Sequence, residues 1–192
     1  MAMGVERLGP RLWRVVSRSG RVFHMRPIRP EDAPALQRAF VAQKPEDRKL
    51  RLLSAIPRLP DRMALRFCTV DGVRDAALVL VDDAAPGELF GGARLMRDGE
   101  PGTQAGERAE FAVSVASGLQ GEGLGRMALE TVFALGAEMG IRRVWGSVSR
   151  GNEGMRALAR RLGMTERADP DDRTLVICEK TLAPDGGAAT AG

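Results

Sequence analysis

The chain has 192 residues, of which 44% are hydrophobic, and a formal net charge of +4. This length predicts one domain with short extensions and a core of useful size. No run of about 18 apolar residues is present, and the N-terminus lacks a continuous apolar stretch. These features disfavour a membrane span or a secretion signal, so we expect a cytoplasmic protein without a membrane partner.

The composition also limits the chemistry of the chain. His24 is the single histidine, and Cys68 and Cys178 lie far apart without metal-ligand spacing. We therefore expect no metal site, and we expect both cysteines to be reduced, buried thiols. The arginines alternate with acids along the chain, and aromatic residues make up only 4%. This pattern offers few surfaces on which bases could stack, so we expect no nucleic-acid partner.

The first third of the chain predicts a β-hairpin followed by helices. Two strand-like runs flank the turn residues 17–20, which is typical of a hairpin. Glu31 and Asp32 mark a helix start, and Pro45 with its two acidic successors marks another. A third short helix is predicted over residues 59–70.

The remainder alternates between strands and helices. Strands are predicted over residues 76–82, 88–98 and 107–117, and the last of these places Ala109, Phe111, Val113 and Val115 on one face. A helix over 126–140, a strand over 142–149, a helix over 152–163 and a strand over 174–182 follow. This order predicts a mixed α/β domain in which helices pack on a sheet. Residues 183–192 have the composition of a disordered tail.

Three glycines in five positions, Gly121, Gly123 and Gly125, directly precede the helix over 126–140. The first N–H groups of a helix have no internal partners, and glycines can turn successive N–H groups toward one anion. Arg126 can add positive charge, so the loop suits a diphosphate. The sequence lacks the Lys of a P-loop and the glycine spacing of a dinucleotide-binding fold. A tight turn without a ligand remains the alternative.

The segment Gln120–Gly125 resembles the Gln/Arg-x-x-Gly-x-Gly/Ala motif of the GNAT superfamily of acetyl-CoA-dependent acyltransferases. Its surroundings are similar too, because a strand ending in "AVSV" precedes it, Asn152 begins a later helix and Gly163-Met164 closes that helix. The resemblance covers residues 23–182 and leaves residues 1–22 as an N-terminal extension with a hairpin strand. The stretches "MRPIRPEDAPALQRAF", "PEDRKLRLLS" and "AEFAVSVASGLQGEGLGR" resemble the catalytic domain of Pat-type bacterial protein lysine acetyltransferases.

This resemblance implies the GNAT fold, an α/β structure whose mixed central sheet is splayed between its fourth and fifth strands. It also implies acetyl-CoA as co-substrate, with the pantetheine arm along one strand and the pyrophosphate at the glycine loop. The implied cofactor-binding residues are Val113, Ser114, Val115, Gln120, Gly121, Glu122, Gly123, Leu124, Gly125, Arg126 and Asn152. Asn152 could equally serve as a helix cap, and the two roles are compatible.

Acyl transfer to an amine needs a group that takes the proton of the amine. Glu110 matches a catalytic glutamate of Pat-like enzymes and lies in the strand before the loop; Glu107 is a weaker alternative. Many GNAT enzymes protonate the departing thiolate with a tyrosine, but this chain has no tyrosine, and Ala159 stands at that position. Water or Ser149 could supply the proton, so we assign no general acid.

We therefore expect an N-acetyltransferase, either monomeric or homodimeric, whose acceptor is an amine, most simply a protein lysine. A non-catalytic acyl-CoA-binding module and a small-molecule amine acetyltransferase remain alternatives. Cationic small acceptors favour an acidic cleft, whereas the segment "KPEDRKLRLLSAIPRLPDR" shows no dense acidic run.

Overall fold

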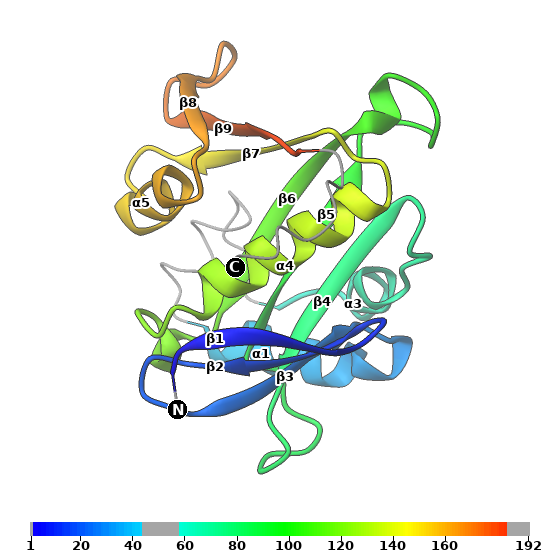
Figure 1. Ribbon diagram of the computed structural model, residues 1–192, viewed down its shortest axis with the longest axis vertical. Coiled ribbons are helices and arrows are strands. Elements are labelled where there is room, and N and C mark those ends of the chain that lie inside the picture. Colours follow the sequence, from blue (N-terminus) through cyan, green and yellow to red (C-terminus); the bar gives the residue numbers. More distant parts are fainter. Residues whose placement is uncertain (1, 44–57, 184–192) are drawn as a thin grey trace, which may run out of the picture.

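The computed structural model describes residues 2–43 and 58–183. Within them, nine strands form one sheet in the order β1-β2-β3-β4-β5-β6-β7-β9-β8 (Figure 1). The strands are β1 (Gly4–Gly9), β2 (Leu12–Val16), β3 (Val22–Pro27), β4 (Asp75–Val81), β5 (Gly91–Arg97), β6 (Arg108–Val115), β7 (Arg143–Ser149), β8 (Thr165–Ala168) and β9 (Leu175–Thr181). The helices are α1 (Ala33–Ala42), α3 (Asp61–Cys68), α4 (Leu124–Glu138) and α5 (Glu153–Arg161), with short 3-10 turns η1 (Pro30–Asp32), η2 (Ala105–Glu107) and η3 (Ser117–Leu119).

The sheet is splayed between β6 and β7. All other neighbouring strands are antiparallel, but β6 and β7 run parallel and pair only from Arg108–Arg143 to Glu110–Trp145. Beyond Glu110, β6 continues to pair with β5 while β7 pairs with β9. Counted from β3, these are the fourth and fifth strands, so the predicted splay is confirmed.

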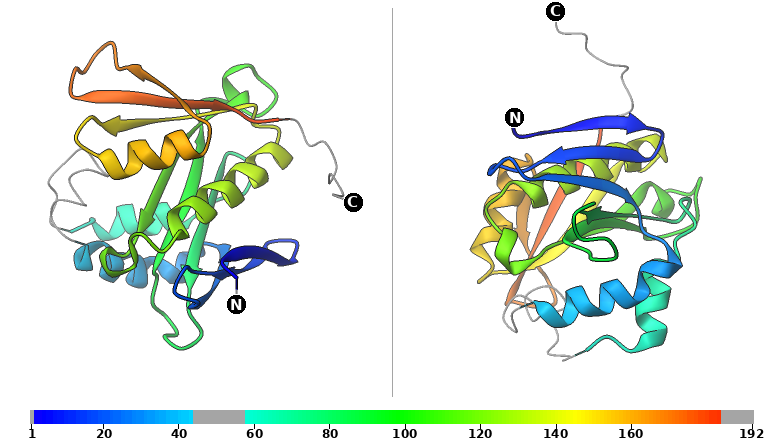
Figure 2. Two further views of the ribbon diagram at one scale, coloured as in Figure 1. Left: turned by 60° about the vertical axis from the view of Figure 1, so that its left-hand side comes forward. Right: turned by 90° about the horizontal axis from the view of Figure 1, so that it is seen from below.

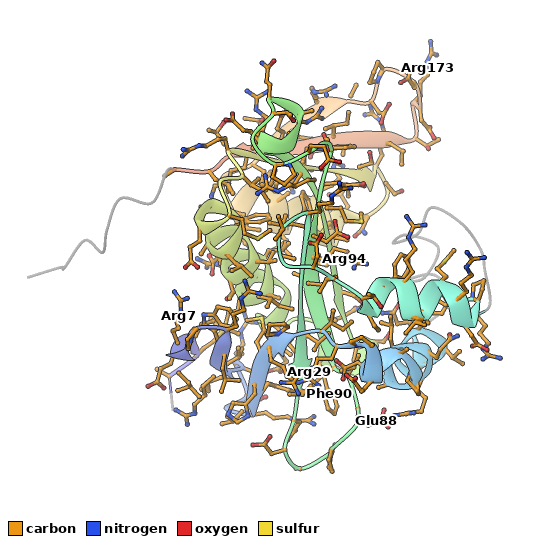
Figure 3. The ribbon with its side chains drawn as sticks, turned by 90° about the vertical axis from the view of Figure 1, so that its right-hand side faces the viewer. Arg7, Arg29, Glu88, Phe90, Arg94 and Arg173 are labelled. Carbon is orange, nitrogen blue, oxygen red and sulfur yellow. The ribbon has the colours of Figure 1, made fainter. Side chains whose placement is uncertain are left out.

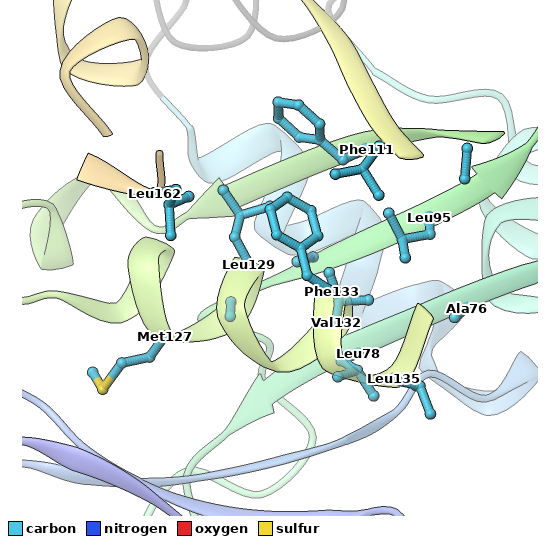
Figure 4. Packing of buried hydrophobic residues seen from close by; sticks show 14 of the residues in the cluster. Ala76, Leu78, Leu95, Phe111, Met127, Leu129, Val132, Phe133, Leu135 and Leu162 are labelled. Atoms are coloured by element: carbon cyan, nitrogen blue, oxygen red, sulfur yellow. The ribbon is translucent and has the colours of Figure 1, made fainter. Parts of the chain in front are cut away.

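The helices cover both faces of the sheet. Figure 2 shows α1 and α3 on one face and α4 with α5 on the other. The main core lies beneath α4, where Leu129, Val132 and Phe133 pack against Leu95 of β5 and Phe111 of β6 (Figure 4). The rings of Phe111 and Phe133 meet edge to face, with centroids 5.8 Å apart. Apolar burial of this kind is the main source of stability in such a domain.

The predicted strands and helices within the described residues are confirmed, with two strands missed. β1 and β8 were not predicted because their residues are largely exposed and lack an apolar face. The helix predicted near Pro45 and the predicted tail from 184 onward lie outside the described residues. The division at residue 22 stays a prediction, and both β1 and β2 continue the same sheet through β3.

Cys68 and Cys178 are both buried and unpaired, as predicted. Burial raises the pKa of the Cys68 thiol to about 11, which makes it a poor nucleophile at neutral pH. Within the described residues, no group of acidic, histidine and cysteine side chains could hold a metal ion. No helix in the same part of the chain is long and apolar enough to cross a membrane.

Candidate active site

Beyond Glu110, the edge of β6 that faces the splay pairs with no other strand of the described residues. The Arg108 carbonyl and the Ala116 amide bond toward β5, whereas the Glu107 carbonyl accepts a hydrogen bond from the chain that enters β7. Since alternate residues of a strand direct their N–H and C=O groups to opposite sides, Val113 and Val115 direct theirs toward β7. Strand β7 has already diverged there, so these groups can pair with a ligand.

Glu110 is the last residue of β6 that pairs with β7. By alternation its side chain lies on the face opposite Phe111 and shares that face with Ser114, whose hydroxyl receives a hydrogen bond from Gln43 at the end of α1. The carboxyl group is half-buried, and loss of solvation raises its pKa. The negative charge of Asp98 raises the pKa further. A carboxyl group with a raised pKa is a better proton acceptor near neutral pH.

Asp98 is held beside Glu110 by two neighbours. Its carboxylate accepts a hydrogen bond from Trp145 Nε1 at 3.0 Å and lies 3.4 Å from Arg108 Nε. The Arg108 guanidinium in turn stacks over the Trp145 ring, 4.6 Å from its centroid. Because Trp145 is the pairing partner of Glu110, this cluster fixes the charge that acts on the candidate base.

The glycine loop ends in an open helix start. Gly121 and Gly123 both have φ of +83°, a conformation that favours glycine, and Gly123 is the N-cap of α4. Because glycine has no side chain, the N-cap residue of α4 supplies no side-chain hydrogen bond to the first amides of the helix. The first amides of α4 are therefore available to an anion.

Gly125 lies where three parts of the site converge. A methyl group added to it would lie 3.5 Å from Val115, 3.6 Å from Leu158 of α5 and 3.9 Å from Val113. The start of α4, the end of β6 and α5 therefore lie close together around Gly125. The side chain of Leu124 is buried in the core, so only its backbone can contact a ligand there.

Several other predicted binding residues already have partners. Glu122 accepts a hydrogen bond from the Ser19 amide, and Arg126 forms an ion pair with Glu130 at 2.8 Å. The Ser114 backbone pairs with Gly92 of β5, so its direction does not favour a contact in the splay. Gln120 is exposed at the end of η3.

The start of α5 is closed by its own side chain. Asn152 Oδ1 accepts a hydrogen bond from the Met155 amide at 3.0 Å, so the capping role predicted for Asn152 is confirmed. The backbone N–H of Asn152 donates a hydrogen bond to the carbonyl of Ser149, the last residue of β7. Ala159 is 2% exposed and carries no proton to donate. Ser149, at the end of β7, lies at the edge of the splay. The general acid stays unassigned.

A family model for the acetyltransferase (GNAT) domain matches residues 23–165. The chain belongs to the GNAT acetyltransferase family. It is 28% identical over 159 residues to an acetyltransferase of Pseudomonas aeruginosa, covering 82% of this chain and 83% of that protein. It is also 27% identical to the acetyltransferase Pat of Mycolicibacterium smegmatis, covering 76% of this chain but only 42% of Pat.

The crystal structure of the GNAT domain of S. lividans PAT superposes with a TM-score of 0.80. The two chains are 29% identical, and the match covers 88% of this chain and 96% of that one. The resemblance to Pat-type GNAT domains is thereby confirmed at the level of sequence and fold.

Two features near this site were not predicted from the sequence. Arg94 of β5 stands opposite Ala112, on the face that carries Glu110, and donates to the Phe67 carbonyl of α3 at 2.9 Å (Figure 3). Burial lowers the pKa of this guanidinium. An arginine inside a strand with apolar neighbours was the available signal, since such a position favours an apolar side chain.

The second feature is an acidic cleft of about 510 Å³ between the α3–β4 loop and the end of β5. Four carboxylates and two arginines line it, and Asp98 joins it to the surroundings of Glu110. The carboxylates belong to Asp71, Asp75, Asp98 and Glu100, and the arginines are Arg74 and Arg97. These acids come from two segments that are distant in the sequence. The sequence therefore shows no dense acidic run that would predict the cleft.

Proposed function

We propose that the protein transfers the acetyl group of acetyl-CoA to an amine, with Glu110 as general base and a protein lysine as acceptor. Membership of the GNAT acetyltransferase family supports acetyl-CoA as co-substrate. The observation that carries the proposal is the arrangement of β6. This one strand places Glu110 at its last paired position and offers the free backbone edge of Val113 and Val115 directly beyond it.

The residues present fit acetyl-CoA. Backbone groups of Val113 and Val115 would hold the pantetheine arm, and the amides of the glycine loop and the first turn of α4, from Gly121 to Arg126, would hold the pyrophosphate. An N–H group on the free edge can also stabilise negative charge that develops on the carbonyl oxygen of a thioester. Asn152, already a cap, would contact the cofactor through the part of its amide that the cap leaves unused.

Acetyl-CoA supplies an acetyl group on a sulfur that leaves readily. Glu110 takes the proton from the acceptor nitrogen as that nitrogen forms its bond to the acetyl carbon and the bond to sulfur breaks. The raised pKa of Glu110 suits it to this task near neutral pH. Water would protonate the departing thiolate, since Ala159 stands where a tyrosine would otherwise serve.

The acidic cleft supports a cationic acceptor. Its four carboxylates exceed its two arginines, and it lies beside the candidate base through Asp98. A lysine side chain approaches as a cation, so negative potential at the cleft would attract it before it loses its proton. The likeness to Pat-type domains favours lysine of a protein. The volume of the cleft also suits a small polyamine, which is the second candidate acceptor.

The unpaired, buried cysteines are typical of a reducing compartment, so we place the reaction in the cytoplasm.

Glu110→Gln tests the proposal directly. We expect kcat to fall about 10²–10⁴-fold, the usual contribution of general base catalysis, while the Kd for acetyl-CoA stays within about twofold of wild type. Release of free thiol from acetyl-CoA, measured with a panel of lysine peptides and polyamines, gives kcat. Glu107→Gln tests the alternative base, and because Glu107 is an exposed glutamate in η2, it should retain wild-type turnover.

Unchanged turnover in Glu110→Gln would remove Glu110 from the role of base. Tight binding of acetyl-CoA without product on any acceptor would instead indicate a non-catalytic acyl-CoA-binding module. Turnover on polyamines but not on peptides would favour the small-molecule acceptor.

A further inference from the structure

The strands β1, β2 and β3 and the turns that join them, which we call the N-terminal hairpin, lie along the helix that carries the cofactor loop. Trp13 and Val15 of β2 belong to the same buried cluster as Met127 of α4. At the other end of α4, Arg7 Nη1 donates to Glu138 Oε1 at 3.0 Å. Figure 1 shows β1 and β2 beside α4. The hairpin therefore bonds to the last residue of α4 and shares a buried cluster with the first turn of that helix.

The turn between β2 and β3 contacts the glycine loop itself. The Arg18 amide donates to the Glu122 carbonyl at 3.0 Å, and the Ser19 amide donates to Glu122 Oε2 at 2.8 Å. The hydroxyls of Ser17 and Ser19 lie 3.0 Å apart and tighten the turn. These bonds hold both the backbone and the side chain of the residue that precedes Gly123.

The contact with Glu122 holds a negative charge against the hairpin. A free carboxylate in a loop that binds a diphosphate would repel it. Hydrogen bonds from the turn, led by the Ser19 amide, lower the pKa of Glu122 and so stabilise its charged form where it lies, against the hairpin. Glu122 is thereby a link between the hairpin and the loop.

The same turn carries an exposed positive charge. The Arg18 guanidinium forms no hydrogen bond or ion pair with the residues that the structure describes, and its charge helps to lower the pKa of Glu122. Its backbone is bonded to the loop that begins α4, whose first turn has positive potential. Arg126, by contrast, is paired with Glu130. Positive groups gathered beside an open helix start favour an anion with several charges.

We propose that the N-terminal hairpin is part of the coenzyme A site: Arg18 binds a phosphate group of coenzyme A, and the Ser17–Ser19 turn positions the glycine loop through Glu122. This inference rests on the proposed function, since it assigns new residues to the same cofactor. It makes Arg18 a binding residue and Glu122 a positioning residue. The phosphate is either the pyrophosphate or the 3′-phosphate, and the two can be separated experimentally.

The first test compares Arg18→Ala with wild type by calorimetry, using coenzyme A and 3′-dephospho-coenzyme A. Loss of one charge-assisted contact should raise the Kd for coenzyme A about tenfold. The same increase with 3′-dephospho-coenzyme A assigns Arg18 to the pyrophosphate, and a vanished increase assigns it to the 3′-phosphate. Arg173→Ala is the matched control, since it removes one positive charge from the loop between β8 and β9 at the far end of the molecule (Figure 3).

The second test uses the sign of the effect at Glu122. If Glu122 positions the loop, Glu122→Ala should raise the KM for acetyl-CoA several-fold at unchanged kcat, although a negative charge has been removed. Glu122→Gln keeps an oxygen that accepts the Ser19 hydrogen bond and should restore wild-type KM or better. Tighter binding in both variants would show a merely repulsive carboxylate and overturn the positioning role.

The proposal fails if Arg18→Ala binds both ligands like wild type and like Arg173→Ala. That result would leave the proposed function intact, because the wild-type protein would still bind coenzyme A. A wild-type protein that binds neither ligand would overturn the proposed function, and this inference with it.

Discussion

The two helices that border the proposed cofactor site begin in opposite ways. α4 begins at Gly123, which has a positive φ and, within the described residues, provides no side-chain cap. α5 begins at Asn152, whose side chain already accepts the Met155 amide. The first helix start keeps its amides for a ligand, whereas the second satisfies one of its own. The resemblance nominates both as cofactor contacts, and in the proposed function the anion binds at the start of α4.

The largest effect is expected from a substitution that adds a negative charge at the start of α4. Gly123→Asp adds a negative charge at the residue that begins α4, where its Cβ would lie 2.8 Å from Met3 Sδ. Repulsion between this carboxylate and a pyrophosphate about 4 Å away would cost about 1–4 kcal/mol. We expect the Kd for acetyl-CoA to rise at least about tenfold, measured by calorimetry.

Gly123→Asn separates charge from backbone strain in that experiment. It has the same shape as aspartate and tolerates positive φ equally well, so it should weaken binding much less. Gly118→Asp adds the same charge in η3, where a side chain meets open space. Equal losses in Gly123→Asp and Gly123→Asn would mean that the loop conformation, and not the anion site, governs binding.

Opening the start of α5 should have a smaller effect. Asn152→Ala removes the cap, and we expect the free energy of unfolding to fall by about 1 kcal/mol, measured by urea denaturation. The KM for acetyl-CoA separates the two roles of this residue. A KM that rises in Asn152→Ala but not in Asn152→Asp, which retains the capping oxygen, would contradict a cofactor contact through the amide nitrogen.

The smallest effect concerns the pH dependence of the base, which lies outside both helix starts. Glu110 accepts a proton only when ionised, so activity should rise with pH through its raised pKa. Asp98→Asn removes a negative charge that raises this pKa, and the acid limb of the kcat profile should therefore move to lower pH.

Glu100→Gln serves as the control for that shift, because Glu100 lies in the same cleft but is paired with Arg74. It should leave the limb in place. An unmoved limb in Asp98→Asn would mean that burial alone sets the pKa of Glu110. Substitutions at Gly123 and Asn152 should change affinity or stability without moving the limb.

The parts of the site that are local in sequence could be predicted from it. The alternation of residues 109–115 predicted β6, and the glycines before an apolar helix predicted the open start of α4. These features depend on neighbours within one turn or one strand. The sequence pattern alone therefore predicts the strand and the helix start, and the resemblance to the family motif implies which ligand binds there.

The parts that depend on distant contacts could not be predicted. The Asp98, Arg108 and Trp145 cluster joins β5, β6 and β7, and the acidic cleft joins two loops. The link between Ser19 and Glu122 spans 103 positions in the chain. Nothing in the sequence near either residue indicates its partner, so such pairs emerge only from the packing of the sheet.

The splay itself is built into the core. Phe111 follows the last paired residue of β6, and its ring lies so close to β7 that a methyl group at Gly146 would approach it to 2.9 Å. The same ring is fixed from the other side by Phe133. The Phe111 ring is thus held between Gly146 of β7 and Phe133 of α4, next to the point where the strands diverge. With this ring fixed in place, association would lose little free energy to rearrangement of the sheet, and affinity could come almost entirely from the contacts made inside the gap.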